Sequence, residues 1–225
     1  MKDRHAMKKI LLASSIAAAF ALPMLAHAES TFQNPAVTGN ATTGKADARL
    51  DFTIVIPQVL FLRVGTSSGN TATDPTVNGL VYTVPGANVG DASTIAAVGG
   101  DIGAGAVTVR AYGNGGNISL NSNTTGPLTT GVAGEVIPWS QISVAALALA
   151  TGTTGFTNAA ITHPAFNTGA AGGAGTPTTL TATNKVVRVE GRWTYTYLNA
   201  NAVAAGTYGG VAVRNGRVTY TATQL

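Results

Sequence analysis

The chain lacks cysteine altogether, and it has few charged and few aromatic residues, 10% and 6% of its 225 residues. Without a thiol, cysteine catalysis and disulfides are excluded, so stability must come from burial and from hydrogen bonds between strands. The formal net charge is +4, and most of it falls on the first ten residues. The rest of the chain carries nine basic and eight acidic side chains. This balance argues against a nucleic-acid partner, because affinity for a phosphate backbone requires clustered Lys and Arg.

The N-terminal segment has the pattern of a secretory signal peptide. Basic residues precede an apolar run over residues 10–25, and a small-x-small site follows at Ala26–Ala28. We therefore expect residues 1–28 to be a signal peptide that is removed before Glu29. A membrane anchor is the alternative, but Pro23 interrupts the run, which is shorter than the ~20 residues that a spanning helix needs.

Short strands separated by loops rich in Gly, Thr, Asn and Ala are predicted for most of the remaining chain. Each strand is rich in β-branched or aromatic residues and is bounded by turn formers. The expected strands cover residues 50–56, 59–64, 80–84, 106–112, 117–121, 142–149, 186–198, 210–214 and 217–223. About nine short strands at this spacing predict an all-β fold, an antiparallel β-sandwich.

The connections between these strands carry their own predictions. Asn114-Gly115-Gly116 and Asn215-Gly216 are typical of hairpin turns, because both central residues accept positive φ. Residues 145–150 are compatible with either helix or strand. The low-complexity segment Gly169–Thr176 is predicted to be a loop.

Catalytic patterns are scarce. His163, the one histidine outside the signal segment, lies between Thr162 and Pro164 and is predicted to be a solvated loop residue. The carboxylates are scattered singly, so neither paired acid–base chemistry nor a metal site is indicated. The sequence therefore predicts a protein that is not an enzyme and has no cofactor.

The aromatic residues allow two interpretations. Trp139 and the run Trp193–Tyr197 could form a glycan-contacting platform, with Trp139 and Trp193 as its rings. Alternatively they pack in the core or cover one sheet, since alternation places Trp193, Tyr195 and Tyr197 on one face. We favour packing.

The segment before Pro57 is the most informative part of the sequence. Leu50, Phe52, Ile54 and Ile56 alternate with polar or smaller residues and so share one strand face. Pro57 interrupts the ladder because it has no N–H to donate, so this strand need not continue in the same sheet. It could add to a sheet edge of a neighbouring subunit. An ordinary edge strand of a complete sandwich is the alternative.

Together with this segment, two further stretches carry a resemblance to a known family. Thr43–Asp47 precedes the alternating strand, Ala205–Tyr208 lies near the other end, and Arg217–Thr223 forms a final strand. This arrangement resembles the fimbrial subunits of chaperone–usher pili, in particular the cysteine-free and spore-coat-U-like branches. In that family an incomplete immunoglobulin-like sandwich lacks its last strand. A periplasmic chaperone fills the groove until the N-terminal strand of the next subunit replaces it.

The resemblance implies roles for particular residues and a division of the chain. Residues 29–57 would be an N-terminal extension with the donor strand, and residues 58–225 the β-sandwich pilin domain. The implied donor-strand side chains are Leu50, Phe52, Ile54 and Ile56. The implied residues of the terminal strand beside the groove are Val218, Tyr220 and Ala222. Phe32–Val37 is a second donor candidate, and residues 209–216 are an insertion relative to the family pattern.

The sequence thus predicts a structural fimbrial subunit that polymerises by donor-strand complementation and serves adhesion or biofilm formation. Its expected partners are identical or related subunits, a periplasmic chaperone and an outer-membrane usher. Its expected location is the fimbrium at the cell surface, reached through the periplasm. The alternatives are a monomeric secreted carbohydrate-binding β-sandwich module and a small outer-membrane β-barrel.

Overall fold

The computed structural model describes residues 31–32, 46–69, 71–210 and 214–225, and it divides the chain into two units, residues 1–56 and 57–225. The expected signal peptide and, apart from Phe32, the second donor candidate lie outside the described residues. In the first unit, the Thr31 hydroxyl donates to the backbone carbonyl of Asp47 at 2.6 Å and accepts from the Asp47 N–H at 2.9 Å.

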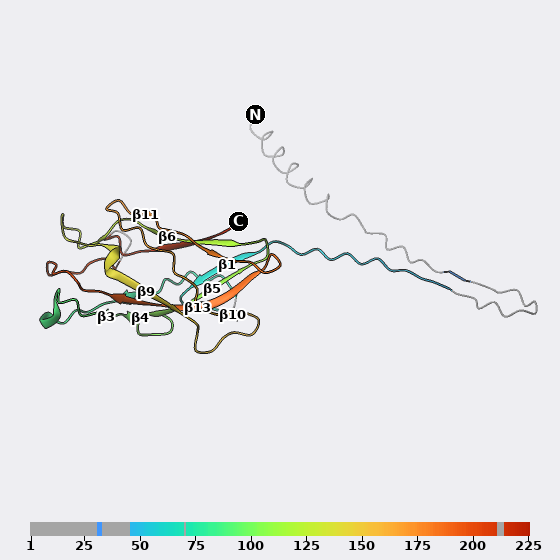
Figure 1. Ribbon diagram of the computed structural model, residues 1–225, viewed down its shortest axis with the longest axis horizontal. Coiled ribbons are helices and arrows are strands. Elements are labelled where there is room, and N and C mark those ends of the chain that lie inside the picture. Colours follow the sequence, from blue (N-terminus) through green and yellow to red (C-terminus); the bar gives the residue numbers. More distant parts are fainter. Residues whose placement is uncertain (1–30, 33–45, 70, 211–213) are drawn as a thin grey trace, which may run out of the picture. The chain divides into compact units, whose positions relative to one another are not determined.

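The second unit is nearly all β, which confirms the predicted fold class at that level (Figure 1). Two 3-10 turns, η1 (Gly86–Asn88) and η2 (Trp139–Gln141), interrupt the strands. The described strands are β1 (Leu60–Val64), β2 (Leu80–Val81), β3 (Ile95–Ala96), β4 (Val98–Gly99), β5 (Ala106–Gly113), β6 (Ile118–Thr124), β7 (Leu128–Thr129), β8 (Val136–Ile137), β9 (Ile142–Leu147), β10 (Thr157–Asn158), β11 (Gly173–Ala174), β12 (Thr178–Leu180), β13 (Val187–Tyr197) and β14 (Thr219–Gln224).

Two sheets contain most of these strands. The larger has the order β1-β5-β13-β10, and both β3 and β9 also pair with β13. The smaller has the order β11-β6-β12, and β14 also pairs with β6. The pair β10–β13 is parallel, and the other pairs in these two sheets are antiparallel. Figure 1 shows β6 and β11 on one side of the unit and β9 and β13 on the other.

Side chains from both sheets meet in one core. Strand alternation on β5, β6 and β13 directs apolar residues inward, because successive side chains of a strand point to opposite faces. The principal buried cluster consists of Val107, Val109, Leu120, Ile161, Trp193 and Tyr195. A second cluster, Ala111, Ile118 and Val187, joins the same three strands.

Most of the longer predicted strands are confirmed with shifted ends. The expected strand at 80–84 is reduced to β2, and the ambiguous residues 145–150 continue β9 as strand as far as Leu147. Residues 211–213, which form most of the expected strand at 210–214, lie outside the described residues. The hairpin at Asn215-Gly216 is therefore untested. No residue from 46 to 59 lies in a strand.

The hairpin predicted at Asn114-Gly115-Gly116 is wrong, because this turn carries the chain from the larger sheet to the smaller one. β5 already pairs with β1 on one edge and with β13 on the other, so no edge remains for β6. The Asn114 side chain instead fastens the segment before β1: its amide donates to the Pro57 carbonyl and its oxygen accepts from the Val59 N–H, both at 2.8 Å.

The loop predicted at Gly169–Thr176 is wrong in part, because β11 lies within it and pairs with the end of β6. The Gly175 N–H also donates to the Ser122 carbonyl at 2.8 Å. A Cβ at Gly175 would collide with the backbone oxygen of Ala165. Glycine is needed here so that two backbone segments can approach closely.

Candidate functional site

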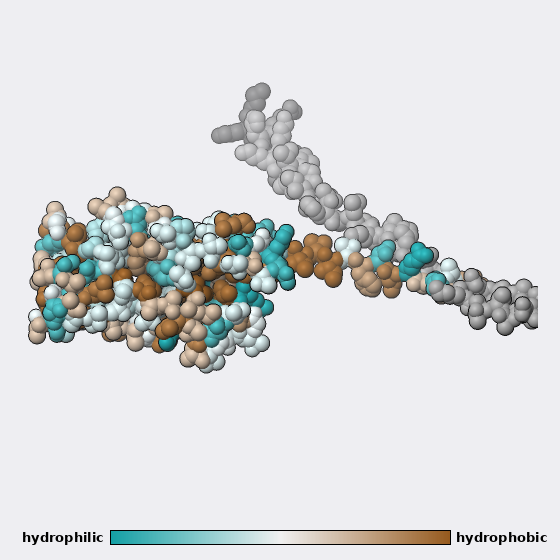
Figure 2. Space-filling view, in the orientation of Figure 1, coloured by the Kyte–Doolittle hydropathy of each residue, from teal (hydrophilic) through white to brown (hydrophobic). Residues whose placement is uncertain are grey.

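The segment Leu50–Ile56 is extended, and its apolar side chains are uncovered. Leu50, Phe52, Ile54 and Ile56 are 73%, 86%, 83% and 75% exposed. In Figure 2 the apolar residues of this segment appear brown. A contiguous row of exposed apolar side chains is typical of an interaction site. Residues 50–56 lie in no strand, so the strand predicted there is not formed in the described chain.

Strands β1 and β14 each pair on one edge, β1 with β5 in the larger sheet and β14 with β6 in the smaller. Within the described ranges, no strand pairs with the second edge of either. β1 and β14 also lie close together, and the side-chain amides of Gln58 and Gln224 are hydrogen-bonded at 2.7 Å. The two sheets therefore have their edges on the same side of the core. We call this pair of edges the β1–β14 edge.

The core is only partly covered along the β1–β14 edge. Leu62 and Val64 of β1 and Tyr220 of β14 pack against the principal cluster, yet all three remain only partly buried. Ala222 packs in the same way against the second cluster. An added strand along this edge would therefore find both unpaired backbone groups and apolar side chains.

The predicted terminal strand is present with a small shift. Tyr220 and Ala222 lie in β14 and are partly buried, while Val218 immediately precedes the first residue of the strand. The residues between them, Thr219, Thr221 and Thr223, are exposed. The structure thus brings Tyr220 and Ala222 to the β1–β14 edge.

The prediction of a solvated His163 is wrong, because this side chain is partly buried in an aromatic cluster next to β14. Its Nε2 lies 2.7 Å from the Tyr220 hydroxyl, and its ring is 4.5 Å from that of Trp193 and 4.7 Å from that of Phe166. The Tyr195 and Tyr220 hydroxyls are 2.9 Å apart. Nothing in the local sequence of His163 indicated its contact with Tyr220 and Trp193, since both come from distant strands.

Burial lowers the pKa of His163 to about 4. The unfolded chain has the ordinary histidine value of about 6.5, so it binds more protons than the folded chain between these two pH values. Stability is therefore lost as the pH falls through this window.

We expect the free energy of unfolding to decrease by ~2 kcal/mol between pH 7.5 and pH 5 because of His163. Urea unfolding at a series of pH values measures this decrease. In His163→Gln, which is uncharged throughout, the decrease over the same range should largely disappear. An unchanged pH dependence in this variant would contradict the assignment.

The glycan-contact interpretation of Trp139 and Trp193 is contradicted. Trp193 is 0% exposed and donates from its indole N–H to the Ile161 carbonyl at 2.6 Å. Trp139 is 6% exposed and donates to the Gly126 carbonyl at 2.7 Å. Neither indole offers an open ring face on which a sugar could stack, and the packing interpretation is confirmed.

Comparison of the chain with known proteins gives no relative: no family model matches it, and no curated protein or solved structure is significantly similar to it. Among the described residues, no helix has the length and apolar character needed to cross a bilayer. The same residues contain no group of three or more His, Asp or Glu side chains placed to hold a metal ion.

Proposed function

We propose that the chain is a structural subunit of a surface fimbria, and that residues 58–225 are an incomplete immunoglobulin-like β-sandwich. The observation that carries this proposal is that one chain has both a row of exposed alternating apolar side chains, Leu50–Ile56, and a partly covered core at the β1–β14 edge. The segment supplies a strand, and the edge lacks one. The segment of one copy completes the edge of another.

The energetics favour such a pairing. An extended segment beside β14 or β1 forms backbone hydrogen bonds with the unpaired edge, and its alternate side chains enter the core. Full burial of the four apolar side chains contributes a gross ~6–12 kcal/mol, at roughly 1.5–3 kcal/mol each. This gain offsets part of the conformational entropy that the seven-residue segment loses when it becomes ordered, and the backbone hydrogen bonds add to the gain.

The remaining elements of the proposal come from the resemblance. Residues 1–28 direct export, a periplasmic chaperone covers the β1–β14 edge before assembly, and an outer-membrane usher receives the subunits. The finished fimbria serves adhesion or biofilm formation. A monomeric sugar-binding module is less well supported, because its proposed aromatic platform is buried.

Cysteine cross-linking tests the proposal, because the chain has no cysteine of its own. Ala222→Cys is combined in turn with cysteine at Leu50, Phe52, Ile54 and Ile56. At least one pair should give a ladder of covalent multimers on non-reducing gels, since a disulfide requires Cβ atoms about 3.8 Å apart.

The matched control combines Ala222→Cys with Thr53→Cys, which lies on the opposite face of the segment. We expect this pair to give no species beyond a dimer. Ladders of equal length from both faces, or from neither, would exclude the proposed strand addition.

A further inference from the structure

The outer face of the larger sheet carries a group of arginines. The strand register places Arg63 opposite Arg110 and Arg110 opposite Glu190. Arg188 and Arg192 are two residues to either side of Glu190 on β13, so they share its face. The neighbouring residues Val189 and Trp193 pack in the core, so the arginines face away from it.

Two of these arginines are neutralised by carboxylates. Arg63 pairs with Asp101 at 3.1 Å, and Arg110 pairs with Glu190 at 2.6 Å. Arg188 and Arg192 form neither an ion pair nor a hydrogen bond within the described part of the chain. The Arg192 Nε is buried there without a partner. The face therefore has a surplus of two positive charges.

The guanidinium of Arg188 is held in place although it is exposed. Its central carbon lies 4.7 Å from the centre of the Phe156 ring and 5.6 Å from that of Tyr112. Arg110 lies over the same Phe156 ring at 4.5 Å. Gly155 adopts a φ of +84°, and a Cβ there would lie 3.0 Å from the Arg188 Nη2. The glycine lets the guanidinium lie against the backbone.

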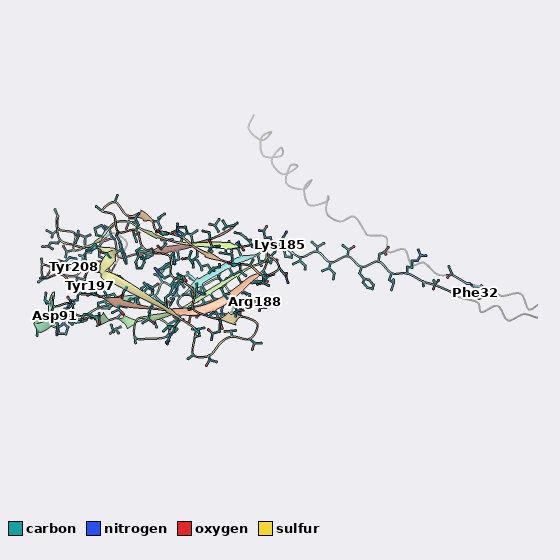
Figure 3. All side chains as sticks on the ribbon, viewed as in Figure 1. Phe32, Asp91, Lys185, Arg188, Tyr197 and Tyr208 are labelled. Carbon is teal, nitrogen blue, oxygen red and sulfur yellow. The ribbon has the colours of Figure 1, made fainter. Side chains whose placement is uncertain are left out.

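These contacts prepare Arg188 to bind an oxyanion. A guanidinium presents a planar fork of N–H donors that matches a carboxylate or sulfate in bidentate geometry. Stacking on aromatic rings fixes the fork before a ligand arrives, which reduces the entropy lost on binding. Figure 3 shows Arg188, together with Lys185, at the end of the folded unit opposite to Asp91.

We propose that this outer face binds an acidic polysaccharide, with Arg188 and Arg192 each taking one carboxylate or sulfate group. The two residues are four positions apart on one strand, which separates their Cα atoms by about 13 Å. Tyr112, directly opposite Arg188 on β5, supplies a hydroxyl for a sugar ring. The proposal is independent of the assembly proposed above.

A polysaccharide fits this surface better than a nucleic acid does. Affinity for a phosphate backbone rises with the number of phosphates that Lys and Arg neutralise. This face offers only two unpaired arginines and no lysine on its strands. Two aromatic rings, one of which carries a hydroxyl, lie beside Arg188, as recognition of a sugar requires.

Binding of the purified chain to fragments of polygalacturonate, of heparin and of neutral dextran tests the proposal by calorimetry. The first two probes distinguish a carboxylated from a sulfated ligand. We expect at least one of them to bind and dextran not to bind. Arg188→Ala with Arg192→Ala should weaken binding about tenfold, which corresponds to the loss of charge-assisted hydrogen bonds.

The matched control, Arg214→Ala with Arg217→Ala, removes the same charge from exposed positions elsewhere and should change affinity less than about twofold. Arg188→Lys keeps both the charge and the fold and should still weaken binding several-fold, because lysine lacks the planar fork. Equal losses in the two double variants, no binding to either acidic glycan, or tighter binding to single-stranded DNA would overturn the proposal.

Discussion

We expect Ile54→Asp to abolish the proposed fimbrial polymers and Thr53→Asp, one residue earlier, to leave them intact. This is the largest effect we expect. Ile54 lies in the apolar row that we propose to enter the core of the next subunit, so the variant loses ~1.5–3 kcal/mol of apolar burial and must also bury a carboxylate. An unpaired buried charge costs several kcal/mol more. Thr53 faces the other side, so the same charge remains in water.

Polymer formation by the two variants is measured by electron microscopy of sheared surface material and by the mass of the purified protein. Both side chains are exposed in the isolated subunit, so the two variants should be exported in equal amounts and unfold with equal free energies. If Ile54→Asp still formed filaments, or if Thr53→Asp lost them equally, Leu50–Ile56 would not be the donor segment.

Glu190→Gln is expected to destabilise the folded unit by ~3–5 kcal/mol, because it removes the carboxylate that pairs with the buried Arg110 guanidinium. Arg110 donates to Glu190 Oε2 from Nε at 3.0 Å and from Nη2 at 2.6 Å, and Nη2 also donates to the Thr153 hydroxyl at 2.6 Å. The Thr153 N–H donates to the other carboxylate oxygen of Glu190. Loop residues 148–156 are thereby joined to β5 and β13.

The ionised form of Glu190 is the stable one in the folded state. Burial opposes its ionisation, but the hydrogen bonds from Thr153 and Arg110 outweigh this effect and lower its pKa. A carboxyl whose folded pKa is lowered contributes its full stability above the unfolded pKa and loses it as the pH falls through the folded value. The destabilisation in Glu190→Gln should therefore be full at pH 7 and should shrink in acid.

Urea unfolding of Glu190→Gln at pH 7 measures the effect, with Asp74→Asn as the matched control for a partly exposed carboxyl. We expect the control to change stability by less than ~1 kcal/mol, since surface interactions contribute little. Replacing both members of the pair, Arg110→Met with Glu190→Leu, should restore most of the loss. A loss below ~1 kcal/mol in Glu190→Gln would mean that Arg110 finds another partner.

Sequence patterns predicted the strands that carry their own alternation. β5, β6 and β13 alternate over seven or more residues, and each was located within a few positions. Apart from β2, the two- and three-residue strands were not predicted, because they are too short to show an alternating pattern of their own. The turn at Asn114 was wrongly predicted to be a hairpin, because the local sequence does not show that both edges of β5 are occupied.

The candidate sites also differ in whether a local sequence pattern predicts them. The apolar row Leu50–Ile56 is contiguous in sequence, so alternation alone identified it. The contact of His163 with Tyr220 and the stacking of Arg188 on Tyr112 and Phe156 each join residues far apart in the chain. No local pattern marks such pairs, and only the folded chain brings them together.

The pairing of β6 has a kinetic consequence. All its partners come later in the chain: Thr124 pairs with Gly173, and Ile118 pairs with Gln224, 106 positions further on. Such non-local pairing gives the smaller sheet a high contact order, and domains dominated by it fold in milliseconds to seconds. During synthesis, β6 keeps both edges unpaired while the intervening residues emerge. Each new molecule therefore passes through an interval in which β6 can pair with another chain, and unpaired strand edges of this kind favour aggregation.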